Sequence, residues 1–234
     1  MDYTYKVKSE IQLRYSRFYE EARYGRKKDR AHHLYHGQLE KHLRFSSYYS
    51  VLEVGAGVGE HFEYVRHDFK SYIISDIVLP DFSKSPAAVR EFKNNGSILS
   101  LRQLDAEQLD IESDSVDRVI FTCVLHHLNN PSKALDEARR VVRNGGTISI
   151  YLPADPGLLY RVAQTIGSTR KLRKHFTKME LLILRGLEHR NHFASLAAMI
   201  RGTFYSDDIR IFGVPKYLPW NFSLFRIYQI EVVK

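Results

Sequence analysis

Short apolar runs alternate with longer amphipathic stretches between residues 48 and 153 of this chain. Strands are predicted where these runs are rich in β-branched and aromatic residues: "YYSVLEVGAG", "SYIISDIV", "SILSLRQLDA", the centre of "VDRVIFTCVLHHL" and "TISIYLP". "HFEYVRHDF" is predicted as a helix. "PSKALDEARRVV" predicts another, because Pro131 stands in its first turn and apolar residues recur at i, i+3, i+4 and i+7. Asn144-Gly145-Gly146 is expected to end it.

Repeated strand–helix units predict an α/β fold, a Rossmann-like doubly wound sheet with helices on both faces. Two more strand candidates, "DDIRIFGV" and "FSLFRIYQIEVV", bring the expected sheet to seven strands, most of them parallel. Residues 1–50 are predicted as an N-terminal helical cap, and residues 51–234 as the main domain with a helical insertion at about 156–202. On such a sheet, ligands bind beyond the carboxyl ends of the strands, where the strand order reverses.

Composition and charge limit the classes of protein that remain. The chain has 234 residues, enough for one substantial core, and its single cysteine excludes an internal disulfide and a multi-cysteine metal site. No metal is expected. No apolar run reaches the roughly 20 residues of a membrane helix, and the first residues do not resemble a signal peptide, so a cytoplasmic location is expected.

The basic residues are concentrated at the two flanks of the chain. The net charge is +8, made up of −5 over residues 51–155, +5 over 1–50 and +7 over 156–202, with +1 in the tail. Localised basicity indicates that the flanks meet an anionic substrate or surface. A solvated basic helix face explains any one segment equally well.

The glycines of "VLEVGAGVGEHF" do not match a dinucleotide-binding loop. Gly55, Gly57 and Gly59 are spaced G-x-G-x-G, and Glu60 occupies the third glycine position of the dinucleotide motif. Together with Glu53, this acid makes the loop unattractive to a pyrophosphate. A phosphate-free ligand that carries a cation fits better.

Two further acids are predicted at the ends of the next strands. Asp76 follows Gly59 by 17 residues, a position where a carboxylate can accept hydrogen bonds from ribose hydroxyls. Asp105, followed by Ala106, ends the third strand and can face the exocyclic amine of adenine. Each acid alone is more often a solvated loop residue. With Glu53, the three are expected to line one crevice.

At this point the chain resembles the class I S-adenosylmethionine-dependent methyltransferases, specifically the small-molecule group related to ubiquinone and menaquinone methyltransferases. The resemblance rests on "VLEVGAGVGEHF", "IISDI" and "LDAEQLDIESDSVDRVIFTCVLHHLNNPSKALDEARRVVRNGGTISI", and covers residues 50 to 152. It implies that S-adenosylmethionine binds and S-adenosylhomocysteine is released. The implied cofactor residues are Glu53 and the loop Gly55, Ala56, Gly57 and Gly59 for the methionine portion, Asp76 for the ribose, Asp105 and Ala106 beside the adenine, and Thr122 and Cys123 on the pocket wall.

The acceptor side of the reaction is less sharply defined. His126 and His127 of "LHHL" follow the fourth strand and are candidate general bases, although one ring can pack under the cofactor while the other faces solvent. Tyr15 and Tyr19 either pack as a helix face or close over the cofactor. Arg161 and the other basic residues of the insertion can meet a phosphate or carboxylate.

We therefore predict a methyltransferase with a small-molecule acceptor, a sugar, nucleotide-sugar or secondary metabolite, plausibly anionic, with O-methylation favoured slightly over N-methylation because of the histidine pair. One alternative is a lipid-like quinone or polyprenyl acceptor, with the basic insertion in peripheral contact with a membrane surface. Another is tRNA, although no RNA-binding module or nucleobase-methyltransferase motif is present. The acceptor atom, the pathway and the oligomeric state do not follow from the residues.

Overall fold

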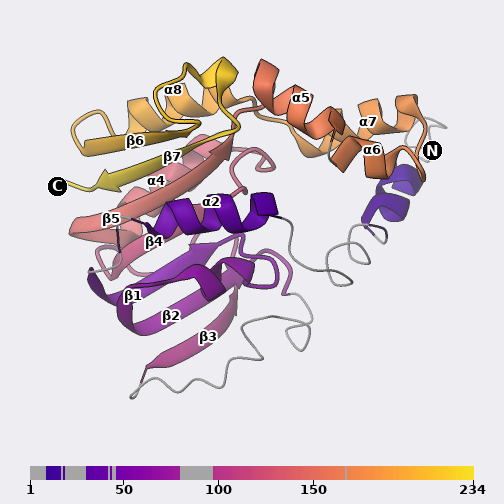
Figure 1. Cartoon of the computed structure of the whole chain (residues 1–234). Helices are drawn as coiled ribbons and strands as arrows, with labels where there is room; N and C mark the ends of the chain where they lie inside the picture. Colours follow the sequence, from indigo (N-terminus) through magenta and orange to yellow (C-terminus); the bar gives the residue numbers. More distant parts are fainter. Residues whose placement is uncertain are drawn as a thin grey trace.

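The computed structural model describes residues 9–16, 18, 30–41, 43, 46–79, 97–166 and 168–234. Its centre is a seven-stranded sheet in the order β3-β2-β1-β4-β5-β7-β6 (Figure 1). All neighbours pair in parallel except β7, which runs antiparallel to β5 and β6. This confirms the predicted fold class. The strands are β1 (Ser47–Val54), β2 (Asp68–Asp76), β3 (Ile98–Gln103), β4 (Val116–Thr122), β5 (Val142–Pro153), β6 (Asp208–Val214) and β7 (Phe225–Glu231).

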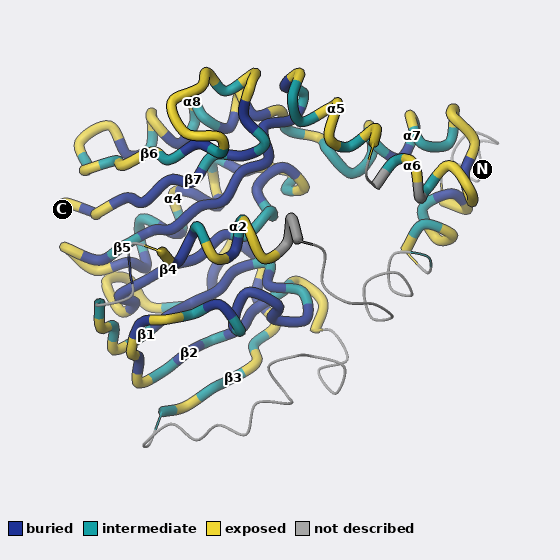
Figure 2. The backbone as a smooth tube through the Cα atoms, viewed as in Figure 1, coloured by how far each residue is buried: buried dark blue, intermediate teal, exposed yellow. Residues whose placement is uncertain are grey.

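Helices cover both faces of the sheet, and the alternation of side chains along β1 shows how. Leu52 and Val54 face the layer of α4 (Pro131–Val141) and α8 (Phe193–Thr203), whose apolar residues form one core cluster with them. Val51 points to the opposite face, where Leu39 of α2 (Arg30–Glu40) and Tyr72 belong to a second cluster. The central strands β4, β5 and β7 are accordingly among the most deeply buried parts of the molecule, whereas the edge strands β3 and β6 are largely exposed or half-buried (Figure 2).

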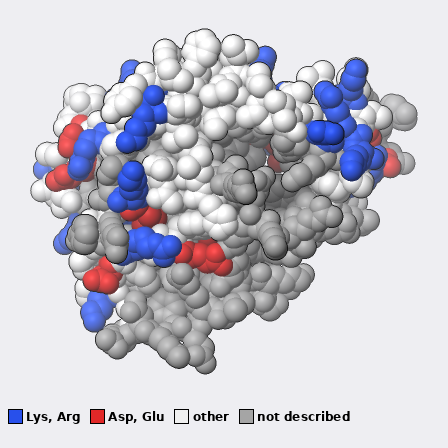
Figure 3. Space-filling view, in the orientation of Figure 1, with Lys and Arg blue, Asp and Glu red and all other residues white. Residues whose placement is uncertain are grey.

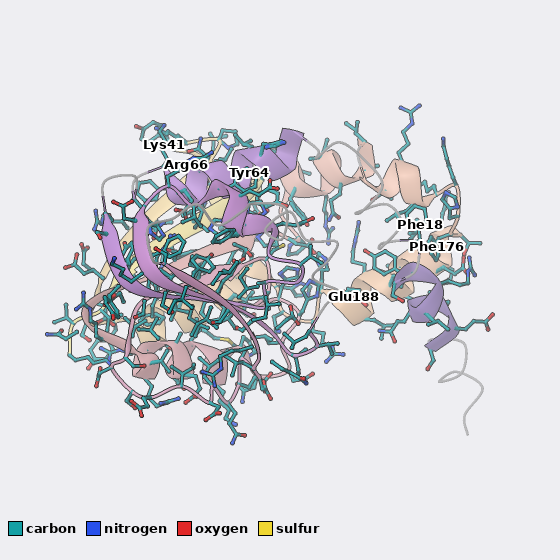
Figure 4. All side chains as sticks on the ribbon, turned by 90° about the horizontal axis from the view of Figure 1, so that it is seen from below. Phe18, Lys41, Tyr64, Arg66, Phe176 and Glu188 are labelled. Carbon is teal, nitrogen blue, oxygen red and sulfur yellow. The ribbon has the colours of Figure 1, made fainter. Side chains whose placement is uncertain are left out.

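A third group of helices lies beside the sheet and not on it (Figure 1). It consists of α5 (Leu158–Ile166), α6 (Ser168–Leu172), α7 (Lys178–Glu188) and the helical residues 9–16, and we call it the lid. Ile11, Phe176 and Leu184 form its small separate core. Phe18 meets Phe176 edge-on at 6.1 Å between ring centroids, and the two rings lie together in Figure 4. The insertion predicted at 156–202 thus supplies lid helices and also a core helix, α8.

Two local predictions were wrong. The helix predicted over 61–69 is only a short 3-10 helix, η1 (Glu60–Tyr64), because β2 begins at Asp68 and pairs there with Ser47. Asn144-Gly145-Gly146, predicted to end the helix, lies inside β5. Strand β5 starts directly after α4, because Val142 already pairs with Val116 of β4. In both places strand pairing outweighs the local signal. A second 3-10 helix, η3 (Trp220–Phe222), precedes β7. No helix among the described residues is long and apolar enough to cross a membrane.

A buried charge pair fastens α2 to the sheet. Oε1 of Glu40 accepts hydrogen bonds from Nη2 of Arg118 at 2.6 Å and lies 3.0 Å from Nε2 of His61. Nε of Arg118 also donates to Ser149, whose hydroxyl donates to Gln229. Burial alone raises the pKa of Glu40, but Arg118 and His61 outweigh it and hold that pKa well below its ordinary value. Glu40 therefore stays ionised inside the protein.

Replacing Glu40 by alanine is expected to lower the free energy of unfolding by about 3–5 kcal/mol, because the buried Arg118 guanidinium would lose its counter-charge. Urea denaturation measures this, with Glu112→Ala on the exposed loop as the control. The double variant Glu40→Leu/Arg118→Met should regain much of the loss. The stabilisation is fully present above the unfolded pKa of about 4.3 and is lost progressively as the pH falls from there through the much lower pKa of Glu40 in the folded protein. Equal losses of unfolding free energy in Glu40→Ala and in the control Glu112→Ala would contradict the assignment.

Candidate active site

One large cavity lies at the carboxyl ends of β1 to β4, between the sheet and the lid, with a volume of about 1980 Å³. The strand order reverses between β1 and β4, so this is the position expected for a ligand on a doubly wound sheet. The wall on the sheet side comes from loops that follow β1, β2, β3 and β4. The opposite wall comes from α5, α6, α7 and residues of the N-terminal helical segment.

The glycine loop turns by three left-handed residues. Gly55, Gly57 and Gly59 have φ values of 64°, 55° and 73°, which L-residues adopt at a cost. At Gly55 a Cβ atom would overlap Cγ2 of Val124 and lie 2.8 Å from its Cβ. The Ala56 amide donates to the Ser75 carbonyl at 2.9 Å, so the loop folds back on the end of β2. The glycines thus set the shape of the wall and bring the loop close to β4.

Asp76, at the end of β2, both supports the loop and faces the cavity. Its Oδ2 accepts a hydrogen bond from the Gly57 amide at 2.8 Å. Its side chain stays half-buried on the cavity wall, beside Ile77. Asp105 and Ala106 line the next part of the wall, where Oδ1 of Asp105 accepts from the Glu107 amide at 2.8 Å. The predicted cofactor acids of β2 and β3 therefore lie on one surface.

Glu53 does not lie on that surface. It is fully buried, its Oε2 accepts a hydrogen bond from the Tyr72 hydroxyl at 2.8 Å, and its Oε1 lies 3.5 Å from Oγ1 of Thr122. Burial raises its pKa. The structure thus places Glu53 behind the glycine loop, linking β1, β2 and β4. Its predicted contact with a methionine portion stays a prediction.

Thr122 and Cys123 line the cavity at the end of β4. Cys123 adopts φ 63°, a left-handed value that costs a non-glycine residue energy, and its amide donates to the Tyr151 carbonyl at 3.3 Å. This residue turns the chain sharply into the loop that holds Val124. The thiol is half-buried on the wall.

His126 and His127 are both brought to the cavity, and they also anchor the lid. The carbonyl of His126 accepts hydrogen bonds from the amides of Arg190 and Asn191 at 3.1 and 3.2 Å. Nδ1 of His127 donates to the carbonyl of Glu188 at 2.7 Å. Figure 4 shows Glu188 where the lid meets the sheet domain. The loop after β4 and the junction between α7 and α8 therefore form one connected unit.

A third histidine completes the cluster, and sequence reasoning missed it. His189 lies at the end of α7, and its ring centroid is 4.6 Å from that of His126 and 5.7 Å from that of His127. Its Nδ1 lies 2.7 Å from Oδ2 of Asp155, just beyond β5. Both side chains belong to segments outside the matched motifs, and the one available signal was that Asp155 follows a strand end. Among the described residues no group of three or more His, Cys, Asp or Glu side chains is arranged to hold a metal ion.

A second pair of imidazoles connects the cavity to the buried charge pair. His36 and His61 border the cavity, and their Nδ1 atoms lie 2.8 Å apart, so one ring donates to the other. Since His61 also reaches Glu40, a continuous hydrogen-bonded chain runs from the cavity wall to Arg118. This chain fixes the position of η1 directly after the glycine loop.

The residues predicted to contact the acceptor differ in their position relative to the cavity. Tyr15 borders the cavity and packs edge-on against Phe176, with 6.2 Å between ring centroids. Arg161 is exposed and is not part of the cavity wall. Tyr19 lies outside the described residues. Other basic side chains of the lid do border the cavity: Arg173, Lys174, Lys178, Arg185 and Arg190.

Comparisons with known proteins place the central part of the chain. Residues 52–150 match the model of the methyltransferase domain. Methyltransferase AacuQ of Aspergillus aculeatus is 36% identical over 101 residues, which is 43% of this chain and 31% of that protein. The match therefore spans about a third of the length of that curated relative.

Solved structures share the fold at low identity. A carbon methyltransferase of CurJ superposes with a TM-score of 0.60 at 18% identity, over 89% of this chain and 56% of that one. The 1,6-didemethyltoxoflavin-N1-methyltransferase of Burkholderia thailandensis, solved with bound 1,6-didemethyltoxoflavin and S-adenosylhomocysteine, gives a TM-score of 0.55 at 18% identity, over 100% of this chain and 92% of that one.

Gly55→Ala is expected to destabilise the protein by about 2–5 kcal/mol, because it combines a left-handed φ with overlap against Val124. Thermal denaturation measures the change. Gly186→Ala is the matched control, since a Cβ there meets nothing within 4 Å inside α7, and it should stabilise the helix by about 1 kcal/mol. The double variant Gly55→Ala/Val124→Ala should recover the overlap part only. Equal effects at Gly55 and Gly186 would count against this account.

Proposed function

We propose that this chain, whose residues 52–150 match a methyltransferase domain, is an S-adenosylmethionine-dependent methyltransferase and methylates a small anionic molecule held between the sheet and the lid. The observation that carries the proposal is the charge distribution within a single cavity. Acids at strand ends occupy one side, and basic side chains of the lid occupy the other. Each side suits a different ligand.

The sheet side fits S-adenosylmethionine by the chemistry of its groups. Asp76 and Asp105 present carboxylate oxygens at successive strand ends, which can accept hydrogen bonds from ribose hydroxyls and an adenine amine. The glycine loop carries no side chain at three positions beside them, so the ligand can approach the backbone. Acids also favour a ligand with positive charge. When bound, this cofactor supplies a methyl group attached to a positively charged sulfur.

The lid side fits an acceptor with a carboxylate or phosphate. Arg173, Lys174 and Lys178 are exposed side chains on the cavity wall. Figure 3 shows Lys and Arg gathered over the lid. Apolar residues of the lid also border the cavity, among them Leu172 and Leu181, so the acceptor has both an apolar body and an anionic group.

The residues between the two sides have a positioning task. Thr122, Cys123 and Val124 separate the acidic wall from the histidine cluster. Methyl transfer is an in-line displacement, and holding two reactants in line is worth several kcal/mol of the barrier. The turn at Cys123 and the hydrogen bond from its amide to the Tyr151 carbonyl set the position of this part of the wall.

Asp76→Ala is expected to weaken S-adenosylhomocysteine binding by about 10- to 150-fold, the value of one hydrogen-bonded charged group at 1.5–3 kcal/mol. Titration calorimetry on the full chain measures it. Asp136→Ala, an exposed acid on α4, is the control and should bind as the wild type does. Unchanged affinity in Asp76→Ala would refute the assignment of the cofactor side.

The double variant Arg173→Glu/Lys174→Glu is expected to raise KM for anionic acceptors about tenfold and to leave S-adenosylhomocysteine affinity unchanged, since two attractive charges become repulsive and the sum over both positions reaches about 1.4 kcal/mol. A panel of hydroxybenzoates and their neutral methyl esters with labelled S-adenosylmethionine tests this. Arg210→Glu/Lys216→Glu, which are remote from the cavity, form the control. Equal use of acids and esters would contradict an anionic acceptor, and transfer that requires vesicles would favour a lipid acceptor.

A further inference from the structure

Three imidazoles meet at the acceptor side of the cavity, and the hydrogen bonds around them assign each a different role. His126, His127 and His189 all border the cavity. They come from two segments that the fold ties together, the loop after β4 and the end of α7. Asn191 strengthens the connection, because its side-chain amide donates to the carbonyl of Leu128 at 2.8 Å. The three rings are therefore held in a fixed arrangement.

We propose that His189, oriented by Asp155, is the general base that takes a proton from the acceptor, and that the methylated group is therefore a hydroxyl. The proposal rests on the proposed function and specifies its acceptor atom. A hydroxyl is a weak nucleophile until it loses its proton, whereas an amine that arrives deprotonated needs no base. A paired base on the acceptor side thus has a use with a hydroxyl and none with an amine that arrives deprotonated.

The geometry determines which nitrogen of His189 is free. Nδ1 lies 2.7 Å from Oδ2 of Asp155, and a carboxylate oxygen only accepts, so the proton sits on Nδ1. In the neutral ring, Nε2 then carries the lone pair. The side chain of His189 is 20% exposed, on the cavity wall, so that lone pair is accessible to a ligand.

Asp155 is itself held firmly. It follows the last residues of β5, is buried, and its carbonyl accepts a hydrogen bond from the Phe193 amide at 2.9 Å. Burial raises the pKa of Asp155, but the hydrogen bond and the charge of His189, together with the charges of Arg185 and Arg161, outweigh burial, and the net pKa is lowered. The carboxylate is thus ionised and can stabilise an imidazolium when His189 takes up a proton.

The other two rings have partners unsuited to this task. His126 is buried, its Nδ1 has no hydrogen-bond partner among the described residues, and burial followed by its histidine neighbours lowers its pKa well below the usual value. His127 donates to a neutral carbonyl of Glu188, and burial lowers its pKa as well. Neither ring has a carboxylate within hydrogen-bond distance to balance the charge of a captured proton, and the nearest one to His127, that of Glu188, lies 3.9 Å away.

The proton and the charges balance in a single step. His189 takes the acceptor's hydroxyl proton at Nε2 while the new O–CH₃ bond forms and the donor's S–CH₃ bond breaks. The sulfonium becomes a neutral thioether, and the positive charge appears on the imidazolium beside Asp155. His189 later releases its proton to water, which restores the starting state without any further reactant.

The test that needs no acceptor is an NMR measurement of the tautomer of His189. The full chain, labelled with ¹⁵N-histidine and saturated with S-adenosylhomocysteine, should show His189 protonated at Nδ1 and unprotonated at Nε2, with the signal assigned by its loss in His189→Gln. Asp155→Asn should change the tautomer, because an amide can donate to Nδ1, and Asp155→Glu should restore it. A ring protonated at Nε2 in the wild type overturns the proposal.

The kinetic arm uses 3,4-dihydroxybenzoate, a probe with hydroxyls and a carboxylate. His189→Gln should lower kcat by about 10²- to 10⁴-fold, with S-adenosylhomocysteine affinity unchanged. His192→Gln, an exposed histidine three positions away, should stay within about twofold of the wild type. An unchanged kcat in His189→Gln overturns the base. Failure of the wild type to bind S-adenosylhomocysteine would instead refute the proposed function, so the two results are distinguishable.

Discussion

Strand β1 pairs in parallel with β2 on one side and with β4 on the other. Strands β2 and β3 therefore extend the sheet in one direction from β1, and β4 and β5 extend it in the other. Parallel strands end at the same edge, which gathers the glycine loop, Asp76 and Cys123 there although they lie far apart in the chain. The loop after β1 has to turn beside the residues that follow β4. The left-handed glycines and the close approach of Gly55 to Val124 are consequences of this turn. The position of the site therefore follows from strand pairing.

Burial then divides the charged residues into two sets. Glu40, Arg118 and Glu53 lie inside the protein, where they connect α2, β1 and β4. Asp76 and Asp105 remain on the cavity wall. Glu53 of the buried set and Asp76 and Asp105 of the cavity set all lie at or near the ends of strands in the sequence. Which acids hold the fold and which face the cavity depends on the side of the strand that each occupies.

The sequence predicted those elements whose position depends on a strong local pattern of apolar and polar residues. Apolar runs bounded by glycine or aspartate located the seven strands, and the amphipathic pattern behind Pro131 located α4. The helix over 61–69 failed because local periodicity does not include the pairing of β2 with β1. Long-range contacts were also invisible: His189 and Asp155 are 34 residues apart, and Glu40 and Arg118 are 78 apart. Arg161 was selected by charge, and its outward position on α5 depended on packing.

The histidine pair of "LHHL" shows how a correct location can suggest an incomplete role. Its two residues do reach the cavity, but the carbonyl of His126 and Nδ1 of His127 are committed to the end of α7. Those bonds hold His189 against the cavity wall, and Asp155 fixes its ring. Because the lid also carries the basic side chains, one structural unit presents both the groups that would bind an anionic acceptor and the base that would activate it. Docking of the lid on the loop after β4 would then align the proposed acceptor with the proposed cofactor side of the cavity.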